Sequence, residues 1–192
     1  MLLEKLSNAF GPSGCEDEVR RLLARELRDK VDDLQTDALG NLIAFKKGTG
    51  SEPRLKVMVD AHTDEVGLMI TRIEKNGMLG FRPVGGVDAR LLMAKGVVVG
   101  EKRLPGVIIA PPIHLTKPEQ LKQVVKIDQM VIDIGASSAD AAKGLVKIGE
   151  YAAFDTRFEV LDEGGLRTVK AVSYTHLRAH ETNDLISYAG VW

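Results

Sequence analysis

The run LKVMVDAH, at residues 55–62, constrains the fold more than any other stretch of the sequence. After Lys56, its apolar residues follow one another without an alternating polar residue. A strand with one face in water alternates apolar and polar side chains, whereas a strand covered on both faces, as in an α/β sheet, is apolar throughout. We therefore predict a buried strand over Leu55–Asp60 within an α/β fold.

The segment before this run has the patterns of two helices and a further strand. Apolar residues at roughly helical spacing predict a helix over residues 1–10, and the turn-forming residues Gly-Pro-Ser-Gly follow it. A second helix is predicted over residues 15–32, with Ser13 and Glu16 as a capping box. A strand is predicted over Asn41–Lys46.

From Gly67 onward the sequence is typical of a small β-rich module. The stretch ASSADAAKGL predicts one short helix capped by Ser137 or Ser138, and FDTRFEVL predicts a returning strand. Short apolar runs separated by turn residues predict further strands over Leu68–Ile73, Gly96–Val99, Val107–Ala110 and Val131–Ile134.

These changes of pattern divide the chain into four parts. Residues 1–66 begin an α/β domain, residues 67–165 form a β-rich insert, and residues 166–171 return to the first domain. Residues 172–192 show neither a helical nor an alternating period. A shift of composition like this usually marks a linker or a tag, so we expect the last part to be a tail outside the core.

Composition limits the class of protein. The formal net charge is −1, so we expect no polyanion-binding surface and no nucleic-acid partner. The single cysteine, Cys15, excludes a disulfide framework and fits a reducing compartment. The sequence shows neither a basic-then-apolar leader nor a long apolar run. We therefore expect a soluble, cytoplasmic protein that binds no membrane.

The stretch DAHTDEVGL, directly after the predicted strand, carries the candidate site. His62 follows the strand at the edge of an α/β sheet where ligands usually bind, with Asp60, Asp64 and Glu65 around it. A metal-ligating histidine usually donates its other ring N–H to a carboxylate, and Asp64 is near enough in sequence to accept it. An exposed strand end with ordinary charged residues has the same composition, so spacing alone leaves both interpretations open.

The other histidines carry weaker signals. His114 lies between prolines with no acidic residue nearby, which is typical of a surface or packing histidine. His176 and His180 have the spacing that places both rings on one helix face. Zinc hydrolases with this spacing place a glutamate directly after the first histidine, whereas here Glu181 follows the second. We expect no zinc site there.

Several motifs together strongly resemble the start of the glutamyl- and deblocking-aminopeptidase family: FGPSGCEDEVR, DALGNLIAFKKG and VMVDAHTDEVGLMI. The resemblance continues through GVIIAPPIHL, MVIDIGASSADAA and VKIGEYAAFDTRFEVL, and so covers about residues 1–171. It implies an α/β catalytic domain interrupted by a β-rich, PDZ-like dimerisation domain. It also implies a metallopeptidase acting on peptides, with two divalent ions (zinc or cobalt) and a homo-oligomer of dimers that assemble into a dodecamer. By this resemblance His62 is the first metal ligand, and Asp64 is the catalytic acid that orients it.

The resemblance stops at Lys170-Ala171, where the family's K-A-L-D-D-R segment begins. In the family that segment carries a bridging aspartate, and the general-base glutamate, two more acidic ligands and a second histidine come later. This chain instead continues as VSYTHLRAHET, which resembles a translated transposase adaptor of sequencing libraries. We therefore expect residues 172–192 to be a non-native tail and the chain itself to be inactive.

Two other classes of function stay open. Residues 67–165 carry no ligand set and fit a non-enzymatic assembly module. Some relatives in the family carry an endoglucanase label, but a glycoside hydrolase needs two carboxylic acids across a sugar cleft. Asp60, Asp64 and Glu65 crowd one loop instead, which argues against that chemistry.

Overall fold

The computed structural model describes residues 2–110, 124–160 and 167–168. By its internal contacts the chain divides into two compact units. Unit 1 comprises Met1–Ala9, Glu16–Thr63 and Phe158–Trp192, and unit 2 comprises Phe10–Cys15 and Asp64–Arg157. Unit 2 is therefore formed by an internal segment together with one short loop from near the N-terminus.

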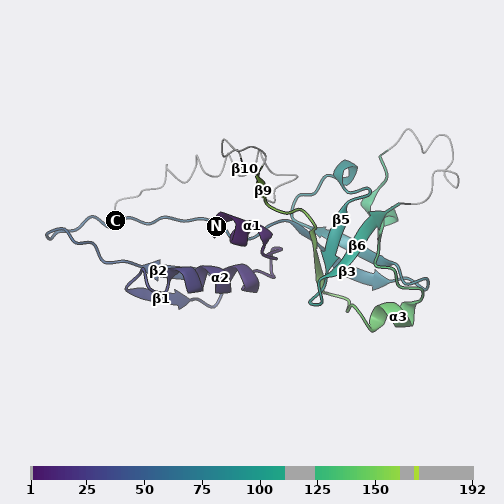
Figure 1. The fold of residues 1–192 in the computed structure, drawn as a ribbon, viewed down its shortest axis with the longest axis horizontal. Coiled ribbons are helices and arrows are strands. Elements are labelled where there is room, and N and C mark those ends of the chain that lie inside the picture. Colours follow the sequence, from purple (N-terminus) through teal and green to yellow (C-terminus); the bar gives the residue numbers. More distant parts are fainter. Residues whose placement is uncertain (1, 111–123, 161–166, 169–192) are drawn as a thin grey trace. The chain divides into compact units, whose positions relative to one another are not determined.

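Unit 1 contains two helices and a two-stranded hairpin (Figure 1). α1 spans Leu2–Asn8, and α2 spans Asp17–Leu27. β1 (Asp33–Thr36) and β2 (Leu42–Phe45) pair in the antiparallel direction. A two-stranded hairpin is marginal by itself in water, so its contacts with α2 matter for its stability.

The connection between β1 and β2 is fixed by hydrogen bonds at Asp37. The Asn41 side-chain amide and the Asn41 backbone N–H each donate to the Asp37 carboxylate at 2.8 Å. These bonds favour the charged form and lower the pKa of Asp37. Arg20 of α2 donates to the Gly40 carbonyl oxygen in the same connection at 2.8 Å. The hairpin turn is thereby tied to the helix.

Both predicted helices of unit 1 are confirmed, and both are shorter than predicted. α2 begins at Asp17, and the preceding Glu16 makes no capping bond with its side chain. The predicted capping box is therefore wrong, because the Ser13 hydroxyl donates to the Asp64 carboxylate instead. The strand predicted over Asn41–Lys46 is confirmed as β2. The sequence does not predict β1, since DLQT has no apolar alternation.

The strand predicted over Leu55–Asp60 is wrong for this structure. The segment has no regular secondary structure, and Met58 and Val59 are 79% and 90% exposed. A central strand needs neighbouring strands for its backbone groups and covering layers for its side chains. None of the residues that the structure describes supplies such a neighbour, so the apolar run stays unpaired.

Unit 2 is built around a closed barrel of six antiparallel strands (Figure 1). Around the barrel the order is β3-β4-β7-β6-β5-β8. Closure leaves no unpaired edge strand, which makes the barrel self-contained. The strands are β3 (Gly67–Ile73), β4 (Leu79–Val84), β5 (Gly96–Val99), β6 (Leu104–Ile109), β7 (Val131–Asp133) and β8 (Tyr151–Phe154).

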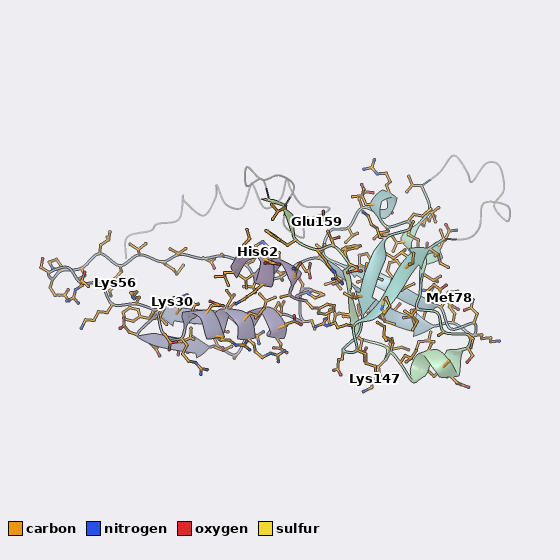
Figure 2. All side chains as sticks on the ribbon, viewed as in Figure 1. Lys30, Lys56, His62, Met78, Lys147 and Glu159 are labelled. Atoms are coloured by element: carbon orange, nitrogen blue, oxygen red, sulfur yellow. The ribbon has the colours of Figure 1, made fainter. Side chains whose placement is uncertain are left out.

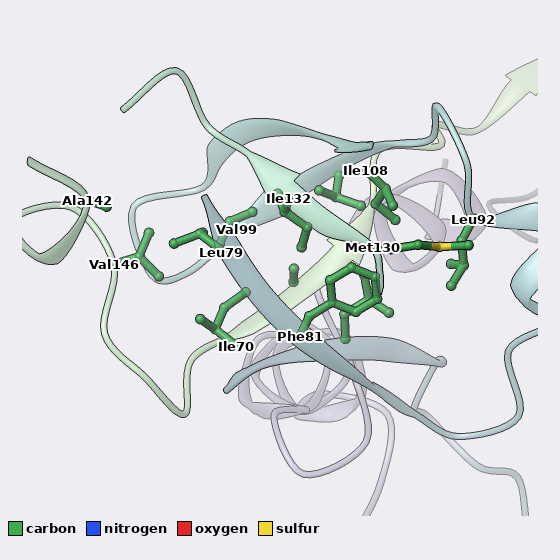
Figure 3. Packing of buried hydrophobic residues seen from close by; sticks show 13 residues of the cluster. Ile70, Leu79, Phe81, Leu92, Val99, Ile108, Met130, Ile132, Ala142 and Val146 are labelled. Atoms are coloured by element: carbon green, nitrogen blue, oxygen red, sulfur yellow. The ribbon is translucent and has the colours of Figure 1, made fainter. Parts of the chain in front are cut away.

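Alternate residues of the barrel strands form the apolar core of this unit, as the close view in Figure 3 shows. Leu68 and Ile70 of β3, and Val97 and Val99 of β5, are buried at the two-residue period of a strand. The interior is therefore filled by side chains. The same cluster includes Leu79, Phe81, Leu92, Ile108, Met130, Ile132, Ala142, Val146 and Ala152.

The strands predicted for the β-rich region are confirmed, with small differences at their ends. β4 is not predicted, because Gly80 and Pro83 weaken the strand signal. The single returning strand predicted for FDTRFEVL is wrong. Phe154 ends β8, and β9 (Glu159–Val160) pairs with β10 (Arg167–Thr168) in a separate sheet. The chain passes from unit 2 to unit 1 between β8 and β9, so the stretch FDTRFEVL does not form one continuous strand.

The predicted short helix is confirmed as α3 (Ala139–Lys143). The Ser138 hydroxyl oxygen accepts a hydrogen bond from the Ala141 N–H at 3.2 Å. Ser138, and not Ser137, is therefore the cap. The described residues of the unit also form two single-turn 3₁₀ helices, η1 (Ala89–Leu91) and η4 (Ile127–Gln129).

The fold class is thus a mixed α/β chain with a closed six-stranded barrel. Within the described residues, no helix has the length and apolar character that crossing a membrane requires. The predicted tail, residues 172–192, lies outside the described residues.

Candidate active-site segment

The stretch DAHTDE lies on the segment that connects β2 to β3. Figure 2 labels Lys56 and His62 on this segment, where the chain has no regular secondary structure. His62 is exposed, whereas Asp64 and Glu65 are half-buried. The division between the two units falls between Thr63 and Asp64, so the two acidic residues belong to the barrel unit.

Asp64 and Glu65 are held by the loop between α1 and α2. Pro12 and Glu65 form a parallel bridge, in which the Glu65 N–H donates to the Gly11 carbonyl oxygen at 2.8 Å. The Ser13 N–H donates to the Glu65 carbonyl oxygen at 3.0 Å. The Gly11 N–H donates to the Glu65 carboxylate at 3.3 Å, and the Ser13 hydroxyl donates to Asp64 Oδ2. Two segments far apart in the sequence thus form one network.

The loop Phe10–Cys15 is itself closely packed within the barrel unit. Pro12 is fully buried and lies against the first residue of β3. A Cβ added at Gly67 would lie 2.8 Å from the Pro12 Cβ and 2.8 Å from the Ala152 carbonyl oxygen. Such distances are shorter than van der Waals contact, so the approach of the loop requires glycine at this position.

Two further contacts hold the ends of the loop. Gly14 has a φ of +85°, and its missing Cβ would lie 2.8 Å from the Tyr151 hydroxyl. At the other end, the guanidinium carbon of Arg103 lies 3.5 Å from the centroid of the Phe10 ring, in a cation–π arrangement. The Gly-Pro-Ser-Gly turn is therefore a structural part of unit 2.

The sequence pattern assigns Ser13 to a helix cap and misses its contact with Asp64. No spacing rule connects the two residues, because they are 51 positions apart. The available signal is that both lie within motifs of the same family resemblance, FGPSGCEDEVR and VMVDAHTDEVGLMI. Motifs that belong to one site lie close together in the fold, so pairing them would have suggested the contact.

The described residues do not provide a complete metal centre. They contain no group of three or more His, Cys, Asp or Glu side chains arranged to hold a metal ion. A catalytic zinc site takes three protein ligands and keeps one position for water or substrate. Among the described residues, His62 and its acidic neighbours therefore supply at most part of a ligand set.

The remaining candidates of the sequence do not extend this set. His114, His176 and His180 lie outside the described residues. Cys15 is half-buried, and its backbone N–H donates to the Pro12 carbonyl oxygen at 2.7 Å. The described role of Cys15 is therefore in the turn of the loop.

The DAHTDE stretch and the barrel strands lie within one match to a known protein family. A family model described as M42 glutamyl aminopeptidase matches residues 40–171, which include the DAHTDE stretch and the barrel strands. The lysyl aminopeptidase of Pyrococcus furiosus is 37% identical over 170 residues, which cover 84% of this chain and 47% of that protein. The chain spans about half the length of the curated relatives it matches, from 43% to 47% in the first three.

Solved structures agree with this match. The TET aminopeptidase from the marine sediment archaeon Thaumarchaeota archaeon SCGC AB-539-E09 has a TM-score of 0.79 at 34% identity, covering 85% of this chain and 46% of that one. The Pyrococcus horikoshii TET1 peptidase, described as assembling into a tetrahedron or a large octahedral shell, has a TM-score of 0.72 at 42% identity, covering 84% and 49%. A structure named endoglucanase, from Thermotoga maritima, has a TM-score of 0.72 at 41% identity, covering 86% and 47%.

Proposed function

Because the chain belongs to the M42 glutamyl aminopeptidase family, we propose that it forms the N-terminal part of a metal-dependent aminopeptidase that hydrolyses N-terminal residues from peptides. The observation that carries this proposal is the family match over residues 40–171, which contains the whole DAHTDE stretch. The lysyl aminopeptidase relative supports the substrate class, since its name describes removal of an N-terminal residue.

In this proposal His62 is the first metal ligand of the complete protein, and Asp64 orients it. Neutral imidazole is a common ligand of zinc and related divalent ions. A carboxylate that accepts the other ring N–H fixes the tautomer and raises the basicity of the ligating nitrogen. When bound in the complete protein, two divalent ions, zinc or cobalt, would supply an activated water and polarise the peptide carbonyl. The network that holds Asp64 supports its role, because an orienting acid must itself be fixed.

We also propose that the chain by itself has no aminopeptidase activity. Peptide hydrolysis needs an activated water, a general base and a polarised carbonyl oxygen. The described residues contain no group of three metal-binding side chains. A single imidazole leaves a divalent ion mostly hydrated, so it does not hold the ion at the affinity of a built site.

The barrel unit is proposed as the dimerisation module of a cytoplasmic homo-oligomer. Its closed barrel has a core of its own, which supports the role of a self-contained assembly module. Support for assembly comes from the TET1 relative, whose description names a tetrahedron and a large octahedral shell. The unit also exposes the large apolar side chains of Leu91, Met93, Val107 and Ile148.

Glycoside hydrolysis is the less supported alternative, despite the name of the Thermotoga maritima structure. A glycosidase places two carboxyl groups on opposite sides of the scissile bond. Asp60, Asp64 and Glu65 instead follow one another along a single segment of this chain. The peptidase proposal therefore takes precedence.

The test is a fused chain in which residues 1–171 precede the part of the Pyrococcus furiosus lysyl aminopeptidase that lies beyond the matched region. With zinc or cobalt it should hydrolyse aminoacyl p-nitroanilides and leave carboxymethylcellulose intact. His62→Ala should abolish hydrolysis, whereas Lys56→Ala, an exposed change on the same segment, should retain it. Cellulose hydrolysis without peptide hydrolysis would overturn the proposal, with circular dichroism showing that each variant is folded.

A further inference from the structure

We propose that Ser13 is a positioning residue for the candidate site. The loop Phe10–Cys15 holds the Ser13 hydroxyl against the Asp64 carboxylate and so fixes the orientation of that carboxylate. This inference rests on the proposed function, because it supplies a structural cause for the orienting role of Asp64. The family resemblance assigns roles to His62 and Asp64 and says nothing of Ser13.

The backbone sets the position of Ser13 along the site segment. The bridge between Pro12 and Glu65 aligns the two segments, with backbone hydrogen bonds of 2.8 Å and 3.0 Å on its two sides. These bonds use the backbone atoms of Gly11, Ser13 and Glu65. They are therefore independent of the side chain at position 13, and a substitution there should leave the two segments aligned.

The packing of the loop then limits how far Ser13 can move. Pro12 has a fixed φ and is fully buried against Gly67, where not even a Cβ fits between the two segments. The Phe10 ring is covered by the Arg103 guanidinium. With the backbone held on both sides, the Ser13 hydroxyl has only its few staggered rotamers, one of which meets Asp64.

The contact itself is chemically suited to orienting a carboxylate. A hydroxyl that donates to a charged carboxylate makes a stronger bond than one between neutral groups. Asp64 is half-buried, so water competes less for its oxygens than at an exposed site. A carboxylate has two oxygens and accepts from more than one donor. The bond from Ser13 to Oδ2 is therefore compatible with an imidazole N–H on the same carboxylate.

The first experiment uses the 192-residue chain and needs no bound metal. Carboxyl carbon NMR at neutral pH reports the hydrogen bonding of Asp64. Ser13→Ala should shift the Asp64 signal, and Ser13→Thr, which keeps a hydroxyl, should bring it back towards the original position. Ser51→Ala, an exposed serine in unit 1, should leave it unchanged. Slow exchange of the Glu65 amide in all variants should show that the backbone bridge persists.

The second experiment uses the fused chain described above. Ser13→Ala should lower kcat about tenfold with little change in KM. A tenfold loss is the lower end of the effect seen when a partner of a metal-ligating group is removed. Ser13→Thr should recover most of the loss. A general loss of structure would instead lower the folded fraction in both variants, and thermal unfolding measures that separately.

The two experiments separate this inference from the proposed function. An unshifted Asp64 signal in a folded Ser13→Ala chain would overturn the contact, and an unchanged kcat would overturn its role. Full activity of Asp64→Ala in the fused chain would overturn both the orienting role of Asp64 and the catalytic part of this inference. A shifted Asp64 signal combined with a reduced kcat supports the inference.

Discussion

At Gly67 the absence of a side chain decides how closely the Gly-Pro-Ser-Gly loop approaches β3. A Cβ added at this residue would lie 2.8 Å from both the Pro12 Cβ and the Ala152 carbonyl oxygen. The loop carries the Ser13 hydroxyl, which contacts Asp64. The position of the Asp64 carboxylate therefore depends on the close packing at Gly67, although Gly67 has no functional side chain.

We expect Gly67→Ala to destabilise the chain by about 1–3 kcal/mol, the usual cost of overpacking a site that cannot relax. Urea unfolding followed by circular dichroism measures the change in free energy of unfolding. The matched control is Gly86→Ala, where an added Cβ would have no heavy atom within 4 Å. Equal stability of the two variants would contradict the close approach.

A second residue-scale prediction concerns Asp88, whose carboxylate accepts bonds from the Arg90 backbone N–H at 2.9 Å and from the Arg90 guanidinium. The side-chain bond from Arg90, followed by its backbone bond, lowers the pKa of Asp88 from 3.8 to about 2. The lowered pKa means that the contact stabilises the fold above pH 3.8, and that this contribution is lost as the pH falls towards 2.

Carbon NMR titration should therefore give a pKa near 2 for Asp88. Arg90→Gln should raise that pKa towards 3.8, since the guanidinium is the largest cause of the shift. Arg54→Gln, a change in the other unit, should leave the pKa of Asp88 unchanged. A pKa that stays near 2 in Arg90→Gln would show that another group holds the carboxylate.

At the scale of elements, sequence patterns predict strands and helices whose residues are close in sequence. They fail for a strand that forms only when other strands of the sheet are present. Four of the six barrel strands, β3, β5, β6 and β7, follow from short apolar runs, because each is buried by the strands beside it. The apolar run over Leu55–Asp60 has the same kind of composition but no neighbouring strand among the described residues. The apolar composition of this run predicts that its side chains are stable when buried. Burial requires neighbouring strands and covering layers.

The cap of α3 is a local feature that the sequence narrows to two serines and the structure assigns to one. Ser138→Ala should cost about 1 kcal/mol of stability, since it removes the acceptor of the Ala141 N–H. Ser137→Ala, an exposed change next to it, should cost less than about 0.5 kcal/mol. Thermal unfolding of the two variants checks this, and a larger loss in Ser137→Ala would reverse the assignment.

At the scale of the whole molecule, the family and the candidate histidine follow from motifs, whereas the network around Asp64 does not. The DAHTDE stretch makes His62 and Asp64 candidate site residues by type, and the family resemblance supplies the roles predicted for them. The partner that holds Asp64 comes from a turn about fifty residues earlier, and the backbone bridge that joins them leaves no local pattern. A contact between residues this far apart in the sequence is identified only once the structure is known.

The proposed assembly role makes a prediction for the intact chain. Sedimentation equilibrium of the 192-residue protein should show reversible self-association, because the proposed dimerisation module has a complete core of its own within this chain. Dilution should shift the population towards monomer. A strictly monomeric species at high protein concentration would contradict the dimerisation role.

The central claim is that this chain carries only part of an M42 peptidase site, and one assay tests it most directly. The 192-residue protein is incubated with an aminoacyl p-nitroanilide and added zinc or cobalt, and its metal content is measured after dialysis. We predict no turnover and far less than one tightly held ion per chain, because the described residues contain no group of three metal-binding side chains. The fused chain should show both turnover and bound metal under the same conditions. Turnover by the 192-residue protein itself, lost on His62→Ala, would contradict the account.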